Sequence, residues 1–242
     1  MKAYRSYLML LCRMSLGRVL LVIPALAAAD AALFLFAMER AFARGQYSLS
    51  AIFDASRMEW AAFLALVALW LLLLPAGRER SGRSYLSRSF TLRRLSLSYR
   101  GRCLTQAVYK FLCFFLLWGA QVAICLGLCL VYALRVDPAL LTPHTLLLTV
   151  SQTTFLYAIL PLGAPLLWLR NVMLLLVCAW DSTMLSMRAF TTLMLLSVWY
   201  PFRSYLTGPW SLLLLAIPLT ILVLLGARKE YVYEFPANAQ DP

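Results

Sequence analysis

Apolar runs of about 20 residues recur along the chain, and they constrain its fold more than any other feature. A helix needs about 20 apolar residues to cross about 30 Å of hydrocarbon, and inside a bilayer the backbone must satisfy its own hydrogen bonds. The pattern predicts an all-α, polytopic membrane protein with six transmembrane helices in a single domain, residues 1–242. The expected spans are at about residues 18–38, 59–76, 109–134, 145–169, 171–199 and 210–227.

Basic residues predict the orientation, because the cytoplasmic loops of membrane proteins carry an excess of Lys and Arg. The chain has 22 Lys and Arg against 10 Asp and Glu. An even number of spans places the basic N-terminus, the basic loop 77–107 and the C-terminal pair Arg228 and Lys229 together in the cytoplasm. The run at 171–199 could cross once or be re-entrant, and a single crossing gives six spans. Since the basic residues lie between apolar runs, we expect membrane lipids as partners and no nucleic acid.

The segment ahead of the first apolar run is amphipathic at the helical repeat. At 100° per residue, Lys2, Arg5 and Arg13 fall on one side, while Tyr7 and Leu11 fall on the other. This pattern predicts an N-terminal interfacial helix, with a frayed basic tail as the alternative.

The residue types that catalysis needs are sparse. His144 is the only histidine of the chain, so neither a histidine-based zinc cluster nor a histidine dyad can form. No glycine precedes a lysine, which excludes a Walker A phosphate-binding loop, and the six cysteines lack CxxC spacing. We therefore expect no enzyme activity, catalytic residue, metal or cofactor, and any ATP hydrolysis belongs to a separate chain.

Polar side chains at membrane depth are the candidates for a functional site. A charge at the centre of a bilayer costs about 2.5–3.5 kcal/mol on insertion scales, and it usually faces a bundle interior or water. The candidates are Asp30, Gln121, Gln152 and Asp181. A proton or substrate role and structural hydrogen bonding between helices both stay open for them.

Two further features concern helix packing. Gly119, Ala123 and Gly127 recur at four-residue spacing, a small-residue ridge that allows another helix to approach closely. Pro161 and Pro165 should kink the span at 145–169, because each proline removes a backbone donor.

The end of the basic loop resembles a known family. Residues 90–100, with the sequence FTLRRLSLSYR, lead through Lys110 into the third run. They resemble the segment between spans two and three in the membrane subunits of type-2 ATP-binding-cassette (ABC) exporters. The family pattern is a Leu-rich turn, a Leu-Pro-x-Ser element and a basic residue, and this chain has Ser96 where the proline is usual. The N-terminal amphipathic segment and the broken stretch at 199–209 are similar to the same architecture.

The resemblance implies a permease subunit of an ATP-driven exporter in a bacterial cell membrane, with both termini cytoplasmic. Such a chain forms half of the translocation path, pairs with another permease as a homo- or heterodimer, and couples to a separate ABC ATPase subunit. It places Arg93, Arg94, Leu95 and Arg100 near the ATPase contact. Two alternatives stay open. One is a non-transporting membrane protein that recruits a partner or anionic lipid through its basic loop, and the other is a proton-coupled carrier that uses Asp181.

Overall fold

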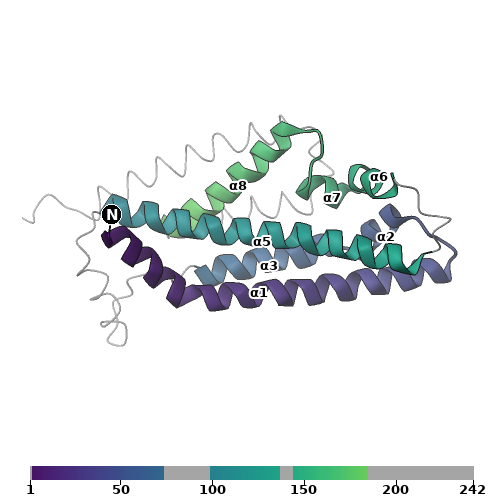
Figure 1. Ribbon diagram of the computed structural model, residues 1–242, viewed down its shortest axis with the longest axis horizontal. Coiled ribbons are helices and arrows are strands. Elements are labelled where there is room, and N and C mark those ends of the chain that lie inside the picture. The colour runs from purple at the N-terminus through teal and green to yellow at the C-terminus, as the bar shows by residue number, and fades with distance from the viewer. Residues whose placement is uncertain (1, 74–98, 137–143, 185–242) are drawn as a thin grey trace, which may run out of the picture.

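The computed structural model describes residues 2–73, 99–136 and 144–184, and these residues are helical apart from short connections, with no strand among them (Figure 1). The helices are α1 (Lys2–Ala43), α2 (Leu49–Ser56), α3 (Met58–Leu73), α5 (Tyr99–Arg135), α6 (Thr145–Gln152), α7 (Thr154–Ile159) and α8 (Pro165–Met184). The expected span at 210–227 lies outside the described residues.

Two segments of the described helices are long and apolar enough to cross a membrane, Ser15–Ala43 in α1 and Cys103–Arg135 in α5. A third candidate is the pair α2 and α3, which is bent by 47°. The bend falls at Arg57, a non-glycine residue in the left-handed region with φ 55°. The described residues are therefore all-helical, with two or three candidate membrane-spanning helices, and the number of six spans stays a prediction.

α1, α3 and α5 lie side by side and enclose the core (Figure 1). The side chains of Phe34, Leu69 and Phe114, one from each of these helices, are fully buried. Phe34 also meets Phe53 of α2, with ring centroids 4.9 Å apart. The first three expected spans thus correspond to α1, α3 and α5, as far as the described residues extend.

The amphipathic N-terminal segment forms the first turns of α1 rather than a separate interfacial helix. The expected faces hold for Tyr7 and Leu11, which are each 1% exposed, and for Arg5 and Arg13, which face outward, whereas Tyr4 on the expected apolar side is 44% exposed. The buried face packs against the start of α5. Gln106 donates a hydrogen bond to the Tyr7 hydroxyl, and the hydroxyls of Ser15 and Tyr109 lie 2.7 Å apart. A neighbouring helix therefore covers the apolar side that was expected to face lipid.

The expected span at 145–169 is divided among three helices. α6 ends before Thr153, which is extended (φ −77°, ψ 123°), and α7 ends before a turn at residues 160–164. Pro161 has no backbone donor, and Gly163 adopts φ +78°, a conformation that glycine tolerates. The expected proline kink is thus a complete interruption, and α8 continues past the expected boundary at 169–171 to Met184.

The small-residue ridge of α5 has no close neighbour among the described helices. A Cβ atom added at Gly119 or Gly127 would meet no atom within 4 Å. Close packing of another helix against this ridge stays a prediction.

Candidate functional site

Asp30 and Gln121, two of the four intramembrane candidates, meet in the core. Asp30 lies near the middle of the apolar segment Ser15–Ala43, and Gln121 lies near the middle of Cys103–Arg135. The Nε2 atom of Gln121 donates a hydrogen bond to Oδ2 of Asp30 over 2.8 Å. The two residues are 0% and 2% exposed, respectively. The sequence placed each residue at membrane depth, and the structure brings them together.

The pair is incompletely hydrogen-bonded. Oδ1 of Asp30 and Oε1 of Gln121 are both buried, and within the described chain neither has a hydrogen-bond partner. Nε2 of Gln121 also lies 3.7 Å from Sγ of Cys125, one turn further along α5. An unpaired buried acceptor costs about 1–3 kcal/mol. A pair that only held two helices together would not need to leave one acceptor unpaired on each residue. We therefore take the pair as the candidate functional site.

The carboxyl group of Asp30 has no cationic partner in the ranges that the structure describes. The ion pair found there joins Arg57 and Glu59, 4.0 Å apart, with the Arg57 side chain exposed. Lys110 is buried in α5, but its Cα lies about 16 Å along the helix from that of Gln121 at 1.5 Å per residue. A negative charge on Asp30 would therefore be isolated within the bundle.

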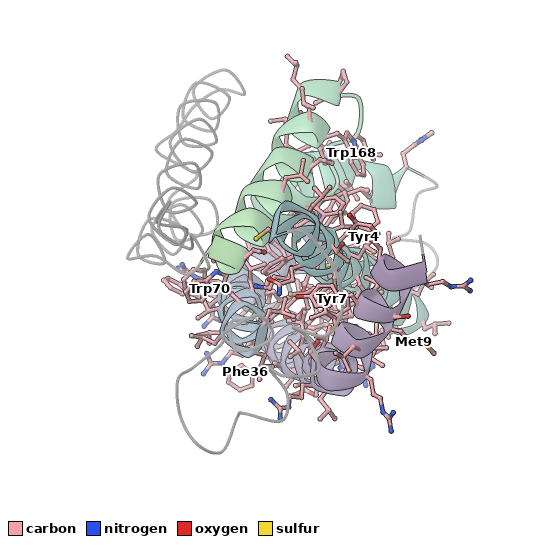
Figure 2. The ribbon with its side chains drawn as sticks, turned by 90° about the vertical axis from the view of Figure 1, so that its left-hand side faces the viewer. Tyr4, Tyr7, Met9, Phe36, Trp70 and Trp168 are labelled. Atoms are coloured by element: carbon pink, nitrogen blue, oxygen red, sulfur yellow. The ribbon has the colours of Figure 1, made fainter. Side chains whose placement is uncertain are left out.

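The interrupted segment approaches α5 at the depth of this pair. Trp118, one turn before Gln121, donates from Nε1 to the carbonyl oxygen of Ile159 over 3.2 Å. Its ring centroid lies 5.1 Å from that of Trp168, whose Nε1 donates to the carbonyl oxygen of Pro161 over 3.0 Å. Figure 2, a view along the bundle, shows Trp168 on the α8 side and Tyr7 among the side chains between the helices.

The turn at residues 160–164 is therefore non-helical backbone close to the middle of the apolar segment of α5. Irregular backbone at membrane depth is tolerated where protein buries it or where it lines a water-filled cavity. Here Pro161 is buried, whereas Leu162 and Gly163 are exposed on the described chain. The turn and the Asp30–Gln121 pair thus both depart from a plain apolar bundle at this depth.

Of the remaining predicted residues, Gln152 lies apart from this pair, Asp181 and Arg100 are placed by their helices alone, and the others lie outside the described residues. Gln152 is exposed at the end of α6, so it does not belong to the buried site. Asp181 lies near the end of α8, and Arg100 lies in the first turn of α5. The candidate coupling residues Arg93, Arg94 and Leu95 are outside the described residues, and their role stays a prediction.

Sequence reasoning did not single out Lys110, Cys125 or Asn171 as site residues, and the fold buries all three side chains. Nδ2 of Asn171 donates to the carbonyl oxygen of Ala158 over 2.9 Å, which ties α8 to α7. The signal for Cys125 was its position four residues after Gln121. Asn171 carried no usable signal, because it lies at the expected boundary between two spans.

The chain matches no model of a protein family, no curated protein and no solved structure. Among the described residues, no group of three or more His, Cys, Asp or Glu is arranged to hold a metal ion. A proposal for function therefore depends on the geometry of the buried pair and on the sequence of the basic loop.

Proposed function

We propose that the chain is the permease subunit of an ATP-driven ABC exporter, with six spans and both termini on the cytoplasmic side of a bacterial cell membrane. The observation that supports transport is the Asp30–Gln121 pair, which leaves a carboxyl and an amide oxygen unpaired at the middle of two apolar helices. Ionisable groups inside membrane segments typically serve a transport path or a proton relay. A protein that only recruits a partner through a loop has no need of them.

The ATP-driven subclass is supported by the sequence of the basic loop. Residues 90–100 resemble the corresponding segment of type-2 ABC exporters, and the sequence lacks a phosphate-binding loop of its own. In this proposal Arg93, Arg94, Leu95 and Arg100 contact a separate ATPase subunit. A second permease, identical or different, completes the path.

α5 provides a direct mechanical link between the proposed contact and the buried pair. It is one uninterrupted helix of 37 residues that begins at Tyr99 and contains both Arg100, in its first turn, and Gln121. A displacement of its first turn by the ATPase would be transmitted along a rigid helix to the contact with Asp30. Opening of the path would then separate α5 from α1.

The test is purification of the tagged full-length chain from its native host in mild detergent, followed by mass spectrometry and an ATPase assay. We expect an ABC ATPase to co-purify, and we expect the triple change Arg93→Ala, Arg94→Ala and Arg100→Ala to abolish its association and activity. The matched control is Arg40→Ala, Arg44→Ala and Arg57→Ala, which removes the same charge at the other end of the bundle.

Absence of any ATPase, or unchanged ATPase association and activity in the triple variant, would contradict the proposal. Substrate accumulation in vesicles without an ATPase would then favour the carrier. Binding to anionic vesicles without transport would favour the recruiting protein.

A further inference from the structure

One additional hydrogen atom, placed between the two unpaired oxygens of the buried pair, would give each oxygen a hydrogen-bond partner. Gln121 already donates one N–H to Oδ2 of Asp30. An ionised carboxylate only accepts hydrogen bonds, so its Oδ1 cannot pair with the amide oxygen Oε1 of Gln121. A carboxylic acid, in contrast, has one O–H donor. An acid and a primary amide can then pair through two parallel hydrogen bonds, one N–H···O and one O–H···O.

We propose that Asp30 and Gln121 form a proton-binding site, in which the proton resides on Oδ1 of Asp30 and is donated to Oε1 of Gln121. One hydrogen gives a partner to both oxygens that otherwise have none. It also removes the isolated charge from the middle of the apolar bundle, where an ionised group is expensive. The site needs only the side chains of Asp30 and Gln121, and it does not depend on whether the chain works with an ATPase.

The groups around Asp30 agree with a proton that stays in place while the bundle is closed. From α5, the titratable side chain beside Asp30 is Cys125. α2 and α3 also pack on α1. Their described acidic groups, Asp54 and Glu59, follow the far end of α1 in the chain, and Glu59 is paired with Arg57. No carboxylate or amine of the described helices is placed next to Asp30 to accept its proton.

A proton at this position adds a hydrogen bond between α1 and α5, and it is released when the two helices separate. If α5 moves away and water enters, the Oδ1–H bond breaks, the proton passes to water and a carboxylate remains on Asp30. The released carboxylate is then hydrated instead of isolated. Separation of α1 from α5 is thereby coupled to the release of one proton.

Infrared spectroscopy tests the site directly, on the full-length protein in lipid vesicles with isotope-labelled aspartate. We expect a carbonyl band of a protonated carboxyl group at neutral pH that disappears in Asp30→Asn. It should shift in frequency in Gln121→Leu, because the partner oxygen is lost. Asp54→Asn, a change at an exposed aspartate of α2, is the control and should leave the band intact.

An ionised Asp30 at neutral pH, seen as carboxylate bands that Asp30→Asn removes, would overturn the proposal. A surviving band together with no associated ATPase would support this site while rejecting the proposed function, so the two can fail separately.

Asparagine at position 30 gives a second, independent test. Its amide can keep both hydrogen bonds permanently, with N–H donated to Oε1 of Gln121 and its oxygen accepting from Nε2. The protonated form carries the stabilisation, so the wild type should lose thermal stability as pH rises and the proton leaves. Asp30→Asn should show no such loss, and Asp30→Leu should be less stable than both near neutral pH. The proposal would be contradicted if the asparagine variant were as unstable as the leucine variant, or if its thermal stability had the pH dependence of the wild type.

Discussion

The α1–α5 pair and the segment from α6 to α8 differ in how their polar groups are hydrogen-bonded inside the apolar bundle. α1 and α5 are uninterrupted helices of 42 and 37 residues, so their backbone hydrogen bonds are made within each helix, and Asp30 and Gln121 are buried between them. In the segment from α6 to α8 the helix is interrupted twice, at Thr153 and at residues 160–164.

What is left unpaired differs between the two regions. Near the turn, three side chains bind the freed carbonyl groups: Trp118 binds Ile159, Trp168 binds Pro161, and Asn171 binds Ala158. In the long helices, one oxygen each of Asp30 and Gln121 stays without a partner. The carbonyl groups freed at the turn are thus satisfied, whereas the side-chain pair between the long helices is not, and at the other break the buried Oγ1 of Thr153 also lacks a partner within the described residues. A break in a membrane helix is therefore a poorer guide to function here than an unpaired oxygen.

The largest effect should follow from Gln121→Leu, which removes the hydrogen-bond donor to Asp30 while leaving the carboxyl group buried. We expect a loss of stability of about 1–3 kcal/mol, the cost of an unsatisfied buried polar group. Chemical unfolding in detergent micelles measures it. The control is Gln152→Leu, the same change at an exposed site on α6, which should alter stability by less than about 0.5 kcal/mol. Equal effects at the two glutamines would remove the distinction between the regions.

The fold of the long helices could be predicted from the sequence because their signal is local. Apolar runs at 18–38 and 109–134 identify helices by length and hydropathy, and a 100° projection gives the buried face of the N-terminal turns. The depth of Asp30 and of Gln121 follows from the same runs. Their contact could not be predicted, because it depends on the rotation and register of α1 against α5. Small side chains, aromatic anchors and tertiary packing decide those quantities.

The path of residues 145–184 was harder to predict for a physical reason. The whole stretch is apolar, so its hydropathy does not indicate a helix boundary at Thr153 or at residues 160–164. Its interruptions depend on tryptophan and asparagine donors that cap the freed carbonyl groups from positions remote in sequence. Pro161 indicated where the helix would be disturbed, but not that Gly163 would complete a turn and allow Pro165 to start a new helix.

Glycines offer the next test of the comparison. Gly163 has φ +78° and open space around a Cβ, so Gly163→Ala should cost about 1–2 kcal/mol from backbone strain alone. Gly119 lies within α5 with equally open space, and Gly119→Ala should be neutral or stabilise the isolated chain by up to about 1 kcal/mol, since alanine is the better helix former. Unfolding of both variants in micelles measures the difference. A destabilising Gly119→Ala change would indicate that another helix packs on the small-residue ridge.

A smaller loss is expected from Asn171→Leu, which removes the bond from Nδ2 to the carbonyl oxygen of Ala158. Interhelical hydrogen bonds in membrane proteins average about 0.6 kcal/mol and reach about 1.7 kcal/mol, so stability should fall within that range. Hydrogen exchange should show faster opening of α7, with α1 unaffected. Leu169→Ala, at an exposed position of the same helix, controls for a general change in α8. Protection unchanged across α7 would mean that the asparagine does not hold the turn.

The smallest effect belongs to Thr153→Val, and its sign is informative. Thr153 is fully buried at the break between α6 and α7, and its Oγ1 has no hydrogen-bond partner within the described residues. Valine has the same shape without the hydroxyl, so removing an unpaired group should leave stability unchanged or raise it by up to about 0.5 kcal/mol. Thr149→Val, the same change at a buried threonine one turn earlier in α6, is the matched control. A loss above about 1 kcal/mol at Thr153 alone would show that its hydroxyl binds a water or ligand in the membrane. The interrupted segment would then join the Asp30–Gln121 pair as part of one polar path.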